Sequence, residues 1–306
     1  MIAPAETFDG TFPFTAHFTH APGFQMHYVD EGHGAPVLCL HGEPTWGYLF
    51  RHIIPTLAQN NRVIVPDHMG FGKSDTPANR EYTLQAHVDN LQALVLELDL
   101  HEITLVMHDW GGPIGSGLAF KYPERIKRLV VTNTPMTFGL PGEAELLLSN
   151  THESRYFQWM GQLYQSGALE TVLGNFNVIL LSVMKTLQGF ERVEAITPTW
   201  LRAYNAPFAT PEECRGAIAF PRSIVSNQGN RLTGFTPQAM AAIRAKPAMM
   251  IEGMRDQVLL PRYFIPIFEA AFPHGKVYRL ENAGHFLYED EPAAIALLIQ
   301  QFIWNS

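Results

Sequence analysis

The sequence predicts an α/β fold, in which a mostly parallel central sheet is flanked by helices and interrupted by an inserted helical cap. Short apolar runs of strand length alternate with stretches whose apolar residues recur at helical spacing, which is typical of a parallel sheet. Between about residues 136 and 220 the strands stop, and Leu, Met and aromatic residues recur at helical spacing. We therefore expect a first part of the core over 1–135, a cap over 136–220 and a second part of the core over 221–306.

The first part of the core contains short apolar or alternating runs that end in turn residues, as strands do. The expected strands are 24–29, 36–40, 62–65, 103–107 and 128–132. Helical spacing predicts helices over 49–58, 82–98 and 114–122. The Gly-rich segment 66–75 follows a strand, but its spacing is not that of a phosphate loop, so we interpret it as a tight connection.

After the cap, the alternation of strands and helices resumes. Strands are expected over 248–251 and 276–280, and helices over 263–271 and 293–302. The same pattern on both sides of the cap indicates that one sheet continues across the insertion.

The amino-acid composition indicates which kinds of binding partner and which compartment to expect. The chain has 306 residues, a net charge of −8 and 46% hydrophobic residues, so a large core is available. The spread of negative charge argues against nucleic acid or an anionic membrane surface as partner. With only Cys39 and Cys214, no disulfide framework is expected. No secretory leader and no apolar run of membrane-spanning length is recognised, which predicts a cytoplasmic protein without a membrane partner.

The first candidate site lies in segment 108–112, with the sequence His-Asp-Trp-Gly-Gly. An expected strand precedes it and an expected helix follows it, so Asp109 would lie in a sharp turn above the sheet, as the nucleophile of a strand–turn–helix elbow does. An ionised carboxylate there can attack carbon directly and form an ester. The alternative is that Asp109 only caps the helix.

Two further residues occupy the positions that a nucleophile at residue 109 requires. Asp256 follows the expected strand 248–251, and His285 follows the expected strand 276–280. Both would lie in loops at the carboxyl edge of the sheet. The chain order of nucleophile, acid and histidine is that of the α/β-hydrolase fold, so the three side chains are predicted to form a catalytic triad.

The sequence resembles the haloalkane dehalogenase family of the α/β-hydrolase superfamily over nearly its whole length. The segments that carry the resemblance are 41–46 (HGEPTW), 67–74 (DHMGFGKS), 108–112 (HDWGG), 203–208 (AYNAPF), 253–256 (GMRD) and 283–286 (AGHF). The resemblance implies that Asp109 displaces halide from a haloalkane to give an alkyl ester. His285, oriented by Asp256, would then activate the water that hydrolyses this ester to the alcohol.

The resemblance also implies an oxyanion and halide site. The backbone N–H groups of Glu43 and Trp110 would form the oxyanion hole, and the indole N–H of Trp110 would bind halide. The expected ligands are a small apolar substrate and water, with halide as product and with no cofactor or metal. One branch of the family uses an Asn at the position of Glu43 as second halide donor, and another uses a cap Trp.

The position matching that cap Trp falls near Leu187 or Phe190, so the second halide donor is left open. From the cap we expect pocket residues among Trp159, Trp200, Phe190 and Tyr204.

Other reactions on the same scaffold are also considered. Epoxide hydrolysis normally uses two cap tyrosines, for which Tyr156, Tyr164 and Tyr204 are available. β-Lactone decarboxylases and coelenterazine luciferases share the scaffold as well. A cofactor-free binding or oxygenase role toward a bulky ligand is the alternative from a different class.

Overall fold

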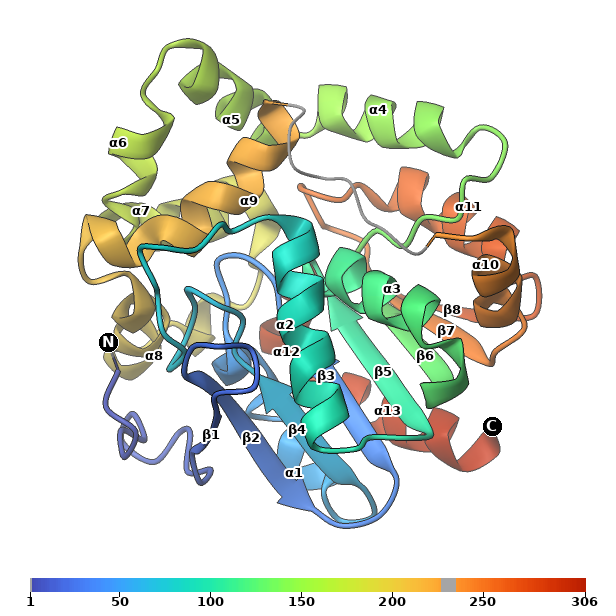
Figure 1. The fold of residues 1–306 in the computed structure, drawn as a ribbon. Coiled ribbons are helices and arrows are strands. Elements are labelled where there is room, and N and C mark those ends of the chain that lie inside the picture. The colour runs from blue at the N-terminus through green and yellow to red at the C-terminus, as the bar shows by residue number, and fades with distance from the viewer. Residues whose placement is uncertain (1, 227–234) are drawn as a thin grey trace.

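The computed structural model of the chain describes residues 2–226 and 235–306. Its centre is an 8-stranded sheet with the order β1-β2-β4-β3-β5-β6-β7-β8, shown in Figure 1. The strands are β1 (His17–Thr19), β2 (Met26–Gly32), β3 (Pro36–Leu40), β4 (Arg62–Pro66), β5 (Ile103–His108), β6 (Ile126–Thr132), β7 (Ala248–Gly253) and β8 (Lys276–Leu280). The pairs β1·β2 and β2·β4 are antiparallel, and the pairs from β4 to β8 are parallel, which confirms the predicted α/β fold.

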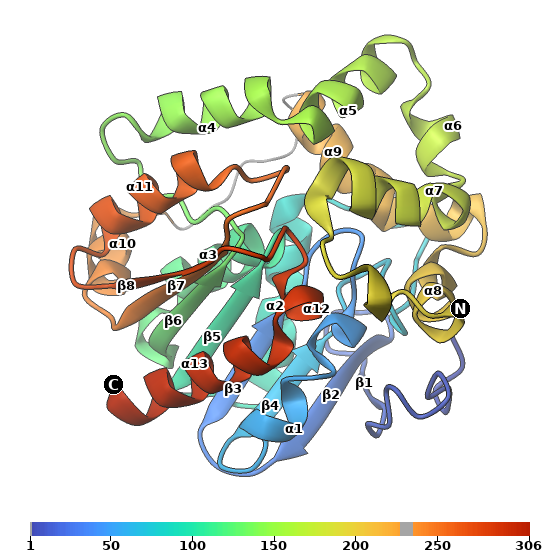
Figure 2. The ribbon, with the colours of Figure 1, turned by 180° about the vertical axis from the view of Figure 1, so that it is seen from behind.

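Helices cover both faces of this sheet. On one face lie α2 (Leu84–Glu97), α3 (Gly111–Lys121) and α10 (Pro237–Arg244), in front of the sheet in Figure 1. On the other face lie α1 (Ile54–Leu57), α12 (Leu287–Asp290) and α13 (Pro292–Asn305), which Figure 2 shows from behind. Helix α11 (Pro261–Ala271) packs against β7 and against the cap helix α4 (Glu143–Glu153). In the described part of the chain, no helix has both the length and the apolar character needed to cross a membrane.

The segment expected to form the cap is helical. After α4 it contains α5 (Arg155–Gln165), α6 (Leu169–Leu173), α7 (Phe176–Ser182), a wide turn over Val183–Gly189, α8 (Pro198–Asn205) and α9 (Arg215–Val225). These helices lie over the carboxyl edge of the sheet in both views (Figures 1 and 2). The division expected at residue 220 falls inside α9, so we propose that the cap extends to the end of this helix.

The structure differs from the expected elements mainly at their ends. The helix expected over 49–58 is instead a short 3₁₀ turn, Gly47–Phe50, followed by α1. Pro55 explains the break, because proline has no N–H for a helix interior but is well accommodated in a first turn, where α1 begins. The strand β1 and the helix α10 were not expected from the sequence.

The register of the central strands places the site residues side by side at the carboxyl edge of the sheet. Strand β5 is buried throughout and lies between β3 and β6. Leu40 pairs with Met107, and His108 pairs with Thr132, so the residues that follow all three strands emerge side by side. This register places segment 41–46, Asp109 and Asn133 at the same point of the carboxyl edge.

Candidate active site

Asp109 lies in a tight turn between β5 and α3. Its φ of 50° is in the left-handed region, which costs free energy for a residue with a side chain and is typical of a nucleophile elbow. The turn is held because the Asp109 N–H donates to the Asn133 carbonyl (3.2 Å) and the Gly112 N–H donates to the Asp109 carbonyl (3.0 Å). The start of α3 packs so closely on β3 that a Cβ at Gly111 would lie 2.2 Å from the Leu40 carbonyl oxygen.

The two oxygens of the Asp109 carboxylate have different neighbours. Oδ1 accepts a hydrogen bond from the backbone N–H of Glu43 (2.7 Å), and Oδ2 lies 3.6 Å from His285 Nε2. Burial alone would raise the pKa of this carboxyl, but the neighbouring His285 imidazole and the Glu43 N–H outweigh burial and lower the pKa. Asp109 is therefore ionised at neutral pH, with Oδ2 available for attack.

Asp256 and His285 form the second part of the site. His285 Nδ1 lies 2.7 Å from Asp256 Oδ2, and both side chains are buried. The other carboxylate oxygen of Asp256 accepts the backbone N–H groups of Val258 (2.7 Å) and Leu259 (2.9 Å). These bonds fix the carboxylate, which in turn fixes the imidazole with Nε2 toward Asp109.

Asn133 holds the same carboxylate from a third strand. Its Nδ2 donates to Asp256 Oδ2 (2.6 Å), and its Oδ1 accepts the N–H of Gly253 (2.8 Å). An amide cannot serve as the acid of the triad, but Asn133 directly follows β6, and this position is a sequence signal that it belongs to the site. Its role as an orienting amide depends on contacts between separate strands.

The charge of His285 is set by its carboxylate neighbours. Burial would lower the pKa of the imidazole, but Asp256 and Asp109 together raise it to about 10. The resting site therefore holds an imidazolium between two carboxylates. Its Nε2 has no hydrogen-bond partner among the described residues.

A cavity of about 770 Å³ opens on Asp109. Helices α4, α5 and α9 of the cap and loops of the core enclose it. Apolar side chains dominate its lining, and the polar ones are few, which is typical of a site for a small apolar ligand. Its lining includes Glu43, Asp109, Trp110, Tyr156, Phe157 and Gln188.

The indole of Trp110 lines this cavity next to the nucleophile. It stacks on Phe220 of α9, with ring centroids 4.4 Å apart and an interplanar angle of 14°. An indole is only a donor, so a ring held in this way can offer its N–H to an anion formed beside Asp109.

Glu43 brings a second polar side chain into the cavity. Its Oε2 accepts a hydrogen bond from the Tyr156 hydroxyl (2.8 Å), while its Oε1 is buried without a partner in the described structure. Burial is the main reason why the pKa of this carboxyl is raised to about 8. Glu43 is therefore mostly uncharged at neutral pH. In this form it does not repel a halide as an ionised carboxylate would.

The four cap residues expected in the pocket do not line it, and this expectation is corrected. Phe190 and Trp200 stack on each other with centroids 5.3 Å apart, and Tyr204 packs on Trp200 at 4.4 Å. The Tyr204 hydroxyl donates to the buried carboxylate of Glu289. Trp159 of α5 is half-buried and packs against the hydrophobic cluster. Phe190 and Tyr204 join the cap to the core, because Phe190 contacts Phe286 and Tyr204 contacts Tyr48.

A polar side chain lines the cavity next to Leu187, one of the two positions considered for a second halide donor. Leu187 is not among the lining residues, but its neighbour Gln188 is. Gln188 belongs to the wide turn Val183–Gly189, and the next residue, Gly189, accepts the His285 N–H through its carbonyl (2.8 Å). This backbone bond holds the turn close to the triad, and the Gln188 side chain lines the cavity there, although no sequence pattern singled it out.

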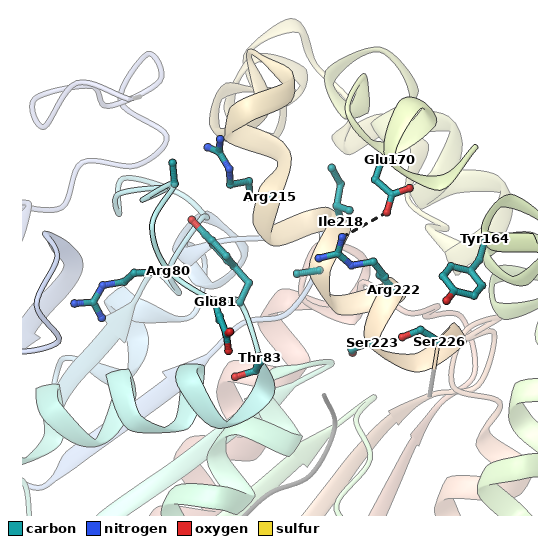
Figure 3. A pocket seen from close by; sticks show the side chains of 13 residues that line it. Arg80, Glu81, Thr83, Tyr164, Glu170, Arg215, Ile218, Arg222, Ser223 and Ser226 are labelled. Carbon is teal, nitrogen blue, oxygen red and sulfur yellow. Dashed lines mark hydrogen bonds and ion pairs between the residues drawn. The ribbon is translucent and has the colours of Figure 1, made fainter. Parts of the chain in front are cut away.

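A second, polar pocket of about 790 Å³ lies on the outer side of α9 (Figure 3). Its lining includes Arg80, Arg215 and Arg222, and Arg222 pairs with Glu170 at 3.4 Å. No triad residue lines it. The described part of the chain also contains no group of three or more His, Cys, Asp or Glu side chains placed to hold a metal ion. The candidate active site is therefore the apolar cavity above Asp109.

Comparison with protein families supports this assignment of fold and scaffold. A family described as alpha/beta hydrolase fold matches residues 35–292. The chain belongs to the alpha/beta hydrolase fold family. The resemblance to haloalkane dehalogenases is also confirmed, since a haloalkane dehalogenase of Mycobacterium marinum is 33% identical over 93% of this chain and 92% of its own.

Other relatives of this α/β hydrolase are named for a different activity. A cis-3-alkyl-4-alkyloxetan-2-one decarboxylase of Shewanella oneidensis is 33% identical over 96% of this chain and 90% of its own. Among solved structures, a tetrameric haloalkane dehalogenase from Paraglaciecola agarilytica aligns with a TM-score of 0.76 and 28% identity, covering 97% of this chain and 96% of that one.

Proposed function

We propose that this α/β hydrolase is a haloalkane dehalogenase that uses Asp109 as nucleophile. The observation that carries the proposal is the arrangement of the Asp109 carboxylate, which is ionised, is bound through Oδ1 by the Glu43 N–H and lines an apolar cavity. In the first step Oδ2 attacks the carbon bearing the halogen, a C–O bond forms and halide leaves. No base is needed, because the nucleophile already carries the charge.

The second step is hydrolysis of the ester on Asp109. Forming the ester removes a negative charge 3.6 Å from His285 Nε2, so the pKa of the imidazole falls from its resting value and it can lose its proton. Neutral His285 then takes a proton from the water that attacks the ester carbonyl. The Glu43 N–H that binds Oδ1 in the resting site would stabilise the oxyanion formed on that oxygen.

Opening and decarboxylation of a β-lactone is the second candidate, favoured by the decarboxylase relatives described above. Its first step would be the same attack by Asp109 on an sp³ carbon, with the lactone carboxylate as leaving group. That carboxylate stays attached to the alkyl ester. Loss of CO₂ would then form the alkene and expel Asp109 as carboxylate, without water.

A paired-tyrosine epoxide site is not formed. Of the three candidate tyrosines, only Tyr156 lines the cavity. Tyr204 is bonded to Glu289, and Tyr164 is 42% exposed and lines the outer pocket instead.

Product analysis separates the two candidate functions. The purified protein is incubated with 1-bromohexane or with a cis-3,4-dialkyl-β-lactone, and bromide, alcohol, alkene and CO₂ are measured. We expect bromide and alcohol in equal amounts from the bromoalkane, and their loss in Asp109→Ala. Alkene and CO₂ from the lactone, with no bromide release, would replace the dehalogenase assignment by the lactone reaction. Activity retained in well-folded Asp109→Ala would contradict both.

A further inference from the structure

We propose that Glu43 is a proton donor of this active site and that the cavity therefore opens epoxides as well as haloalkanes. This inference rests on the proposed function, because it uses Asp109 as nucleophile. It concerns the leaving group, for which the two substrates make different demands. A halide leaves as a stable anion, whereas an epoxide oxygen leaves as a strongly basic alkoxide and needs a proton.

The position of Glu43 suits this role. Its own backbone N–H binds the nucleophile at 2.7 Å, so the side chain starts beside the reacting carbon, and it lines the same cavity. One carboxyl oxygen is occupied, because Oε2 accepts the Tyr156 hydroxyl at 2.8 Å. The other oxygen, Oε1, is buried and has no partner among the described residues. A buried polar atom without a partner is rare, and a proton on Oε1 would be available to a bound ligand.

The surroundings keep that proton in place at neutral pH. Tyr156 of α5, Asp109 of the elbow and His285 of the loop after β8 face the Glu43 carboxyl. Burial and the negative charge of Asp109 favour the protonated form, while Tyr156 and His285 favour the carboxylate. The outcome is a pKa of about 8 for Glu43, and the pKa of Tyr156 is raised well above its usual value. Between pH 7 and 9, Glu43 is thus the group whose protonation changes on this side of the cavity.

The reaction balances with residues already in the site. Asp109 Oδ2 forms a bond to an epoxide carbon, the C–O bond of the ring breaks, and the ring oxygen takes the proton from Glu43 Oε1. The Glu43 carboxylate that results is stabilised by the Tyr156 hydroxyl. Water then hydrolyses the ester with His285 as base, releasing a diol, and the proton accepted by His285 returns through solvent to Glu43. The net reaction is epoxide plus water to diol.

The test compares kcat/KM for 1,2-epoxyhexane and 1-bromohexane in the same preparations. This ratio reports the reaction up to the first irreversible step, so ester hydrolysis does not affect it. Glu43→Gln keeps the shape and a hydrogen-bond donor but has no proton to transfer. We expect kcat/KM for the epoxide to fall by about 100-fold or more, since general acids contribute about 10²–10⁴, and kcat/KM for the bromoalkane to fall much less. Glu145→Gln, an exposed change on α4, is the matched control and should alter neither value.

The pH profile gives a second, independent measurement. Wild-type kcat/KM for the epoxide should fall as pH rises through about 8, because Glu43 loses its proton there. Tyr156→Phe removes a hydrogen bond that favours the carboxylate, so the fall in kcat/KM should occur at higher pH in this variant.

Bromoalkane turnover without any epoxide turnover would overturn the proposal and leave the dehalogenase function standing. Equal losses of kcat/KM for both substrates in Glu43→Gln would also overturn it. So would a wild-type kcat/KM for the epoxide that does not fall as pH rises through about 8. If neither substrate reacts and no adduct forms on Asp109, the proposed function itself fails.

Discussion

At the scale of single residues, the charge of Asp109 controls the role of His285. While Asp109 is ionised, the imidazole is an imidazolium that cannot act as a base, because two carboxylates raise its pKa to about 10. In the proposed mechanism, alkylation of Asp109 would remove one of these charges and convert His285 into the base required for the next step. The order of the two steps would then be set by electrostatics.

This ordering predicts that His285→Phe separates the two steps. The variant should still be alkylated by 1-bromohexane, since the pKa of Asp109 is lowered partly by the backbone N–H of Glu43, which remains. It should then accumulate the ester, because no base is left to activate water. Intact-protein mass spectrometry would detect the added hexyl group, and peptide mapping would place it on Asp109. Multiple turnovers by this variant, or bound substrate without any adduct, would contradict the covalent mechanism.

At the scale of elements, the elbow depends on the close packing of α3 on β3. Gly111 begins α3, and its backbone approaches Leu40 so closely that no side chain fits between them. Since Asp109 lies two residues earlier in the same turn, a displacement of the start of α3 also displaces the nucleophile. A change that disturbs the packing of α3 on β3 is therefore expected to lower both the stability of the protein and its turnover.

We expect Gly111→Ala to reduce both stability and turnover. An added Cβ would lie 2.2 Å from the Leu40 carbonyl oxygen, which is backbone and cannot move aside freely. Overpacking of this kind typically costs about 1–3 kcal/mol of unfolding free energy. Urea unfolding and bromide release measure the two effects. Gly161→Ala in α5, where a Cβ meets nothing within 4 Å, is the control and should retain stability. Wild-type stability in Gly111→Ala would refute this account of the turn.

At the scale of the whole molecule, a buried ionic contact joins the cap to the core. Arg51 follows the 3₁₀ turn after β3 and forms a two-point ion pair with Glu289 of α12, in which Nη2 donates to Oε2 at 2.8 Å. Tyr204 of the cap helix α8 donates to the same carboxylate. Trp46 adds a further link, because its indole N–H donates to the Ala203 carbonyl at 3.0 Å. The cap is therefore fixed to the core at α8.

Glu289→Gln should destabilise the whole chain strongly. Arg51 is buried, and removing its counter-charge leaves an unpaired cation in the interior, which typically costs about 3–5 kcal/mol. The midpoint of urea unfolding measures this loss. Glu194→Gln breaks an exposed pair with Arg192 instead and should leave the midpoint unchanged. Equal midpoints for the two variants would show that the Arg51 contact contributes little.

The predicted α/β order of strands and helices, the helical cap and the chain positions of Asp109, Asp256 and His285 follow from local features. Apolar runs, helical spacing and turn residues identify elements one at a time. In a parallel sheet the carboxyl ends of strands meet at one edge, so residues that follow separate strands are expected near one another. The structure brings these three side chains within contact distance, and their catalytic roles stay predictions for the experiments above.

Only the tertiary structure decided which cap residues face the nucleophile. Trp159, Trp200, Phe190 and Tyr204 have the composition of pocket residues, but the same apolar side chains also serve to bind a cap to a core. In the folded chain, Phe190, Trp200 and Tyr204 pack on one another and on the core instead, while Tyr156 and Gln188 line the cavity. The protonation of Glu43 is likewise a tertiary property: its residue type is visible in the sequence, but its pKa depends on burial and on neighbours from α5, the elbow and the loop after β8, which no local pattern contains.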